Sequence, residues 1–197
     1  PVKQTEDRWE IPVEVSLYNS GKRSANGEGE VTLISPDGKQ MATQSKAITV
    51  HALRDGIANL VLTVVKPQLW SPDSPALYKV KTVVKQNGTV TDAVETRCGF
   101  RTIRFDNNTG FWLNGENIKI KGVCNHQDHA GVGVAVPDAL WEFRLRKLKE
   151  MGVNAYRAAH NPMAKEFMAA CDSMGIMVLD ENRLFNSSPE YVRQLEW

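Results

Sequence analysis

The chain has 197 residues, of which 42% are hydrophobic and 24% are charged, and its formal net charge is +1. This composition is ordinary for a soluble globular protein with one or two domains. The near-neutral charge argues against a nucleic-acid or membrane partner, and no apolar run is long enough to span a bilayer. The three cysteines are few and far apart, which argues against a disulfide framework and against a zinc ribbon.

The amino-terminal segment lacks the apolar stretch of a signal peptide and begins with proline rather than methionine. We therefore expect the sequence to be a piece of a longer chain. Its native compartment is not determined by the sequence, and both the cytoplasm and the periplasm stay open.

Residues 1–101 predict an antiparallel β-sandwich of the immunoglobulin-like type. Residues 9–19 alternate apolar and polar side chains, with Val13, Val15 and Leu17 on one face. Turn signals join further pairs of strands, Pro-Asp-Gly at 36–38 and Asn-Gly at 87–88. No segment of this half has the apolar period of a helix.

From residue 102 onward, strands alternate with helices, which predicts a parallel sheet with right-handed crossovers. Strands are expected at 117–123, 153–157 and 176–180. The first helix is expected over 137–152 with Asp138 as its N-cap, and the second over 161–175 with Asn161 as its N-cap. A third helix is expected to begin near Ser188. The apolar stripe of the first helix comprises Leu140, Trp141, Leu145, Leu148 and Met151.

Polar and ionisable side chains gather where each predicted parallel strand ends. They are the run 124–129 after the first strand, Arg157 and His160 after the second, and Asp180, Glu181, Asn182 and Arg183 after the third. In an open sheet or a barrel, the carboxyl ends of parallel strands form one functional rim. The sequence therefore favours a site at this rim over three unrelated sets of ordinary loop residues.

Several chemistries compete for these residues. The spacing of His126, Asp128, His129 and His160 matches no zinc signature. A thiol nucleophile at Cys124 would need His126 to converge on it, and free cysteines more often serve packing. Asp180 and Glu181 are neighbours on a strand, so only one of them is expected to face the site unless the chain bends. The tryptophans, as sugar platforms, stay open except for Trp141, which is expected in the core.

The stretch "NAYRAAHNP" (154–162) resembles the Asn-x-x-Arg-x-x-His-x-Pro signature of glycoside hydrolase family 2, which includes β-galactosidases, β-glucuronidases and β-mannosidases. Three further stretches are similar to the family in the same order. They are "LWSPDSPALYKV" (69–80), the run from "GFRTIRF" to "CNHQDH" (99–129), and "IMVLDEN" (176–182). The resemblance implies an immunoglobulin-like β-sandwich at 1–101, followed at 102–197 by about three β/α units of a TIM barrel.

The resemblance also implies roles for individual residues. Arg157 is similar to an arginine that supports the catalytic carboxylates, and His126 and His160 to histidines that line the sugar subsite. Asp180 and Glu181 are similar to an acidic pair that shapes the site. The implied activity is that of a retaining exo-glycosidase acting on terminal β-galactosides, so the expected partner is a carbohydrate β-glycoside. The alternatives are a β-glucuronidase or β-mannosidase, or a non-catalytic carbohydrate-binding or scaffold module.

Two departures from the family pattern matter. The positions that resemble a magnesium site are Phe185 and Ser187, which are poor ligands, so no metal and no cofactor are expected. The family's acid/base and nucleophile glutamates are expected beyond the third barrel strand, so no catalytic residue is assigned here, and the chain alone is expected to be inactive. We also expect the open partial barrel to be either mobile or protected by self-association through its exposed sheet.

Overall fold

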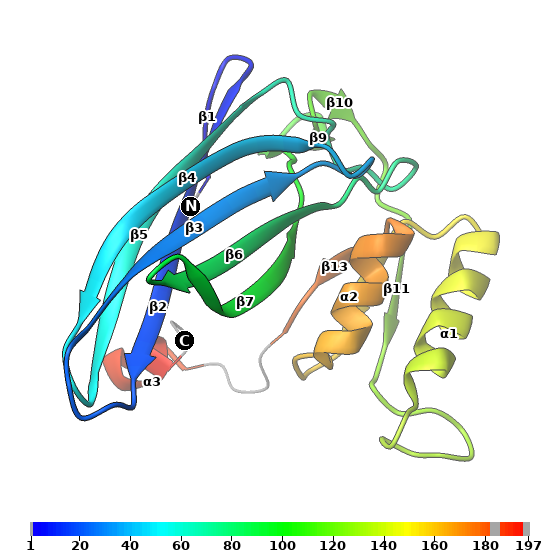
Figure 1. Cartoon of the computed structure of the whole chain (residues 1–197). Helices are drawn as coiled ribbons and strands as arrows, with labels where there is room; N and C mark the ends of the chain where they lie inside the picture. Colours follow the sequence, from blue (N-terminus) through cyan, green and yellow to red (C-terminus); the bar gives the residue numbers. More distant parts are fainter. Residues whose placement is uncertain (1, 182–185, 195–197) are drawn as a thin grey trace. The chain divides into compact units, whose positions relative to one another are not determined.

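The structure is a computed structural model that describes residues 2–181 and 186–194 (Figure 1). The chain divides into two compact units. The first comprises Pro1–Trp70 and Ala76–Arg101, and the second comprises Ser71–Pro75 and Thr102–Trp197.

The first unit consists of two antiparallel sheets (Figure 1). One sheet has the order β1–β2–β5, and the other has the order β4–β3–β6–β7. The strands are β1 (Lys3–Thr5), β2 (Arg8–Asn19), β3 (Ala25–Ile34), β4 (Gln40–Val50), β5 (Arg54–Val65), β6 (Tyr78–Gln86) and β7 (Thr89–Cys98). The predicted antiparallel sandwich is confirmed.

The core of the sandwich follows from the alternation of its strands. Along β2, every second side chain points inward, and Trp9, Ile11 and Val15 are buried. These side chains pack with residues of the opposite sheet, among them Leu33 and Tyr78. The β6–β7 hairpin turns at Asn87 and Gly88, both of which have positive φ, as the Asn-Gly signal predicted.

The second unit begins with a small antiparallel sheet that the sequence analysis missed. It comprises β8 (Ile103–Asp106), β9 (Gly110–Leu113) and β10 (Glu116–Asn117) in the order β10–β9–β8. The Asp106 carboxylate forms the turn between β8 and β9, where it accepts hydrogen bonds from the backbone N–H groups of Asn108 and Thr109. Hydrogen bonds from the side chain and the backbone of Thr109, together with that from the Asn108 backbone, lower the pKa of Asp106 to about 2.

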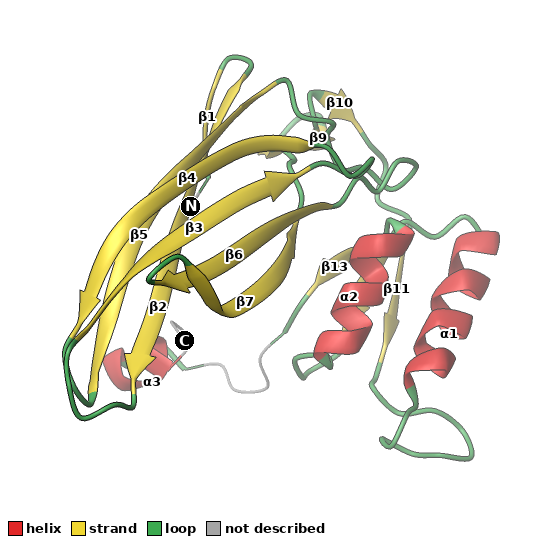
Figure 2. Ribbon diagram, viewed as in Figure 1, coloured by secondary structure: helices red, strands yellow, loops and turns green. Residues whose placement is uncertain are grey.

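Next comes a parallel sheet of order β11–β12–β13, with helices between its strands (Figure 2). The elements are β11 (Gly122–Asn125), α1 (Asp138–Glu150), β12 (Ala155–Ala158), α2 (Lys165–Met174), β13 (Met177–Leu179) and the short helix α3 (Pro189–Gln194). The core joins Trp141 and Leu145 of α1, Tyr156 of β12, and Phe167 and Cys171 of α2. Helices therefore cover the face of the sheet that carries Tyr156.

Two predicted boundaries were wrong. The first parallel strand was expected at 117–123, but β11 covers only Gly122–Asn125. The second helix was expected to begin at Asn161 and Pro162, but α2 begins at Lys165, with Ala164 as its N-cap. The carbonyl of Pro162 instead accepts a hydrogen bond from Gln127, which ties this segment to the loop after β11.

Two details of the first predicted helix were also wrong. Pro137 is the N-cap residue, and Asp138 is the first residue of the helix. Met151 is 74% exposed and does not extend the apolar stripe, because it lies after the last helical turn as the C-cap residue. Among the described residues, no helix is long and apolar enough to cross a membrane.

Candidate active site

The parallel register brings the predicted site residues to one rim. Cys124 of β11 is the pairing partner of Arg157 of β12, which in turn pairs with Leu179 of β13. Arg157 points away from the helix-covered face, because its neighbours Tyr156 and Ala158 are both buried on that face. Glu181 follows two residues after Leu179, so its carboxylate comes within reach of the Arg157 guanidinium.

The Glu181 carboxylate is held at both oxygens. Arg157 donates through Nε to Oε1, and the backbone N–H of His160 donates to Oε2 at 2.8 Å. The His160 ring lies next to the same oxygen, with Nδ1 3.7 Å from Oε2. The hydrogen bond from the His160 backbone lowers the pKa of Glu181, and the Arg157 guanidinium lowers it further.

Arg157 also reaches the neighbouring strand. Its Nη1 donates to the Cys124 sulfur at 2.8 Å. The hydrogen bonds to Cys124 and then to Glu181 raise the pKa of Arg157, so this group is a fixed cation at every pH of interest. The guanidinium therefore bridges the ends of β11 and β13 across β12.

Two histidines lie beside this ion pair. The rings of His126 and His160 have centroids 5.2 Å apart and planes inclined at 53°. Both side chains are exposed. His160 has φ +69°, a left-handed conformation that is costly for a residue with a Cβ atom. That backbone turn is what aims the His160 N–H at Glu181.

The structure thus brings together four of the five predicted site residues, His126, Arg157, His160 and Glu181. Asp180, the fifth, is exposed and makes no hydrogen bond with another described residue. Of the further residues considered at the third strand end, Asn182, Arg183 and Phe185 lie outside the described residues. Within residues 2–181 and 186–194, no group of three or more His, Cys, Asp or Glu side chains is placed to hold a metal.

The structure also describes the surroundings of Cys124, considered as a nucleophile, and of the tryptophans, considered as sugar platforms. Cys124 is hydrogen-bonded by Arg157, and no hydrogen bond joins it to His126 within the described part of the chain. Trp9, Trp70 and Trp141 are buried and serve as core residues, while Trp112 is partly buried beneath the Arg104 guanidinium.

Three residues that organise the site were missed by sequence reasoning. Arg144 of α1 reaches back to the loop after β11, and Gln127 links that loop to Pro162. The Asn154 side chain donates to Lys119 O at 3.0 Å and accepts from Lys121 N at 2.8 Å. Gln127 lies in the polar run 124–129 and Asn154 opens the Asn-x-x-Arg-x-x-His-x-Pro stretch, whereas Arg144 had no sequence signal.

The fold and the rim define a β-sandwich followed by the first β/α units of a parallel barrel with a polar site at its strand ends. Two family models match the chain, "Glycosyl hydrolases family 2" over residues 1–101 and "Glycosyl hydrolases family 2, TIM barrel domain" over residues 104–192. The chain belongs to glycosyl hydrolase family 2.

Individual relatives agree with this assignment. A beta-galactosidase of Bacteroides ovatus is 38% identical over 84% of the chain, and a beta-glucuronidase of Bacteroides fragilis is 34% identical over 83%. The chain spans 20% and 24% of their respective lengths.

Solved structures show the same relation. A family 2 glycosyl hydrolase from Bacteroides cellulosilyticus has a TM-score of 0.85 and 32% identity over 92% of the chain and 25% of its own. A Bacteroides uniformis beta-glucuronidase has a TM-score of 0.90 and 30% identity over the whole chain and 24% of its own. These relatives carry different sugar names, so family membership leaves the sugar open.

Proposed function

We propose that this chain supplies the sandwich (1–101) and the first barrel units (102–197) of a retaining exo-glycosidase that hydrolyses terminal β-galactosides. The observation that carries the proposal is the Glu181 carboxylate fixed between Arg157 and the His160 backbone, beside two exposed imidazoles. Barrel active sites lie at the carboxyl ends of the parallel strands, and this charged, preorganised cluster lies there. The sandwich then acts as a scaffold for the barrel.

Each residue has a role that its geometry suits. The Nη2 group of Arg157 has no hydrogen-bond partner among the described residues, so it is available to a further carboxylate or to a sugar oxygen. His126 and His160 expose imidazole nitrogens that bond to sugar hydroxyls or to charge that develops in the transition state. Glu181 keeps Arg157 oriented, and we give Asp180 a site-shaping role at the same strand end.

Glu181 is a poor candidate for the catalytic acid. A general acid at neutral pH needs a raised pKa, whereas the hydrogen bonds from His160 and Arg157 lower that of Glu181. Retaining hydrolysis also needs a second carboxyl group about 5–5.5 Å away as nucleophile. We therefore propose that both reacting carboxylates come from barrel strands other than these three, and that the 197-residue chain alone is inactive.

The choice of a neutral sugar rests on the cations near this rim. The guanidinium groups of Arg144 and Arg157 are bonded to protein acceptors, and of the Arg157 nitrogens only Nη2 is left without a partner among the described residues. A uronic acid substrate would require a cation for its own carboxylate. A β-glucuronide is the second candidate, because several relatives are named beta-glucuronidases.

The test uses a full-length family 2 protein that carries this chain, assayed on aryl β-galactoside, β-glucuronide and β-mannoside. Arg157→Ala and His160→Ala should each lower kcat/KM by about 100-fold or more, as expected when a preorganised polar group is removed. Arg146→Ala, an exposed arginine on α1, serves as the control and should leave kcat/KM unchanged. Near-normal turnover by the Arg157 or His160 variant would overturn the proposal.

The inactivity of the isolated chain is tested separately. The purified chain should release no product from any of the three aryl glycosides. Turnover that disappears in Glu181→Gln would show that Glu181 is itself catalytic. A full-length protein that binds a glycan but hydrolyses none of the three would favour the carbohydrate-binding alternative.

A further inference from the structure

Arg144 is the most highly connected side chain near the rim that the proposed chemistry does not use. It lies in the middle of α1, yet its guanidinium reaches the loop that precedes the helix. Nη2 donates to Asp128 O at 2.6 Å and lies 2.9 Å from His129 Nδ1, and Nη1 donates to His126 O at 3.3 Å. One side chain therefore bonds three residues of the loop that carries His126.

The guanidinium is held in place from the other side as well. Its Cζ lies 5.0 Å from the centroid of the Trp141 ring, one turn earlier on α1. Trp141 is only 4% exposed and packs edge-on against Phe167 in the core. Stacking on a buried, packed ring fixes the plane of the guanidinium and leaves its N–H groups pointing along that plane.

Arg144 makes no ion pair with a carboxylate among the described residues, although it is half-buried. Its partners are neutral groups, two carbonyl oxygens and an imidazole nitrogen. A surface cation is ordinarily solvated or paired with an acid, so this arrangement points to geometry rather than charge neutralisation. The fork of the guanidinium matches three acceptors that a lysine could not reach together.

The segment 129–133 of this loop is closed by its own backbone hydrogen bonds. His129 and Gly133 exchange two backbone hydrogen bonds, each 2.9 Å long. The contact between Arg144 and His129 therefore links this closed segment to α1. At its start, the His126 carbonyl also accepts from the buried Tyr156 hydroxyl at 3.5 Å.

We propose that Arg144 is a positioning residue, which locks the loop 126–133 and thereby fixes the His126 imidazole against His160. The inference rests on the proposed function only for its catalytic consequence. The lock itself has a chemical signature. Because a guanidinium can only donate, His129 Nδ1 must accept, so the proton of neutral His129 is on Nε2.

The lock is tested on the 197-residue chain by ¹⁵N NMR of the histidine rings at a pH of about 8.5, two units above the ordinary histidine pKa. His129 should show the Nε2–H tautomer in the native chain. Arg144→Met should shift His129 toward a mixture of tautomers and speed amide exchange at Val132 and Gly133. Arg144→Lys should restore these features in part, because an ammonium reaches one acceptor.

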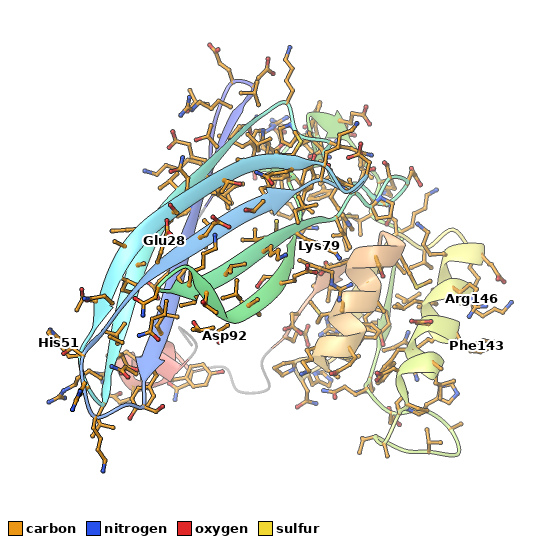
Figure 3. All side chains as sticks on the ribbon, in the orientation of Figure 1. Glu28, His51, Lys79, Asp92, Phe143 and Arg146 are labelled. Carbon is orange, nitrogen blue, oxygen red and sulfur yellow. The ribbon has the colours of Figure 1, made fainter. Side chains whose placement is uncertain are left out.

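Arg146→Met is the matched control. Arg146 is exposed on the same helix and projects away from α2 (Figure 3). Its substitution should leave the His129 tautomer and the loop exchange unchanged. An unchanged His129 spectrum in Arg144→Met would overturn the lock. If that variant does not fold, a native His129 spectrum in a folded Arg144→Gln variant, which cannot span the three acceptors, would overturn it equally.

The catalytic consequence is read in the full-length enzyme. Arg144→Met should lower kcat/KM by about 10–100-fold, the loss expected from a small misplacement of a substrate-contacting group, while Arg146→Met should not. Unchanged kcat/KM together with a released His129 tautomer would overturn the positioning role. A full-length protein without any glycosidase activity would instead refute the proposed function, and the NMR result on the lock would stand by itself.

Discussion

At the scale of single residues, the cluster at the rim is organised around one carboxylate. Glu181 receives a backbone N–H from His160 and the guanidinium of Arg157, and each bond favours its charged form. The carboxylate in turn fixes the direction in which Arg157 points. The ion pair is thus part of the site's architecture, and its strength should depend on pH.

The first prediction concerns this pH dependence. A carboxyl group whose pKa is lowered in the folded state contributes stability above its unfolded pKa, and that contribution is lost as the pH falls through the folded pKa. Glu181→Gln should therefore be less stable than the native chain at pH 7. The difference should shrink as the pH falls below about 4, near the ordinary glutamate pKa. Urea denaturation at several pH values measures it, and a difference that stays constant down to pH 3 would contradict the prediction.

The second prediction separates the backbone of His160 from its ring. His160 has φ +69°, where a Cβ atom costs about 1–2 kcal/mol relative to glycine. His160→Gly should therefore be more stable than His160→Ala by about 1 kcal/mol in chemical denaturation. The same pair of substitutions at Glu166, an exposed position in α2, should give the reverse order, because glycine destabilises a helix. Equal stability of the two His160 variants would contradict the assigned backbone strain.

The sequence located most of this cluster but not its supports. Arg157, His160 and Glu181 follow predicted strand ends, and the parallel register then forces them together. Arg144 and Gln127 could not be predicted, because their partners are backbone carbonyls whose positions depend on loop conformation. Asp180 and Glu181 are neighbours, and only one of them was expected to face the site. Glu181 contacts Arg157, whereas Asp180 is exposed.

At the scale of elements, the errors have physical causes. The stretch 118–121 alternates isoleucine and lysine, the pattern of a strand, but it belongs to none of the strands in the described part of the chain. The side chain of Asn154 bonds the backbone of Lys119 and Lys121 instead. The segment 161–164 has the sequence of a helix start, but Pro162 O is bonded to Gln127, and α2 begins only after that contact. In both cases a tertiary hydrogen bond outweighed a local preference.

The third prediction concerns the end of α2. Gly175 has φ +71°, and a Cβ atom placed on it would lie 2.2 Å from Pro72 O, a backbone atom. Gly175→Ala should destabilise the second unit by more than about 2 kcal/mol, since it combines strain with overlap. Gly152→Ala, at φ +83° with no atom within 4 Å of the added Cβ, should cost only about 1 kcal/mol. Denaturation followed by the helical circular dichroism signal, which comes from the helices of the second unit, compares them, and equal costs would show that the Pro72 contact is absent.

At the scale of the whole molecule, the two units differ in how far the faces of their sheets are covered. The sandwich has its own core from both sheets. In the second unit, helices cover one face of the parallel sheet, whereas Cys124, Arg157 and Leu179 are exposed. Parallel sheets are normally covered on both faces. The face of the parallel sheet that carries Cys124, Arg157 and Leu179 therefore adjoins the rim cluster. Side chains of the cluster are accessible to solvent in this chain.

The last prediction is that the 197-residue chain self-associates through the parallel sheet. Within the described residues, β11 and β13 each pair only with β12, so each has a free edge that can recruit another chain. Leu179 on β13 is 50% exposed, which adds an apolar contact at one edge. Light scattering over a dilution series should show a molar mass that rises with concentration. Hydrogen exchange over residues 118–180 should slow in parallel, because edge amides gain partners.

Leu179→Lys should suppress both effects, since a charge at a strand edge opposes pairing. Val61→Lys, an equally exposed valine on β5 of the sandwich, should not. A strict monomer with slow exchange throughout 118–180 would show that the sheet is protected within one chain.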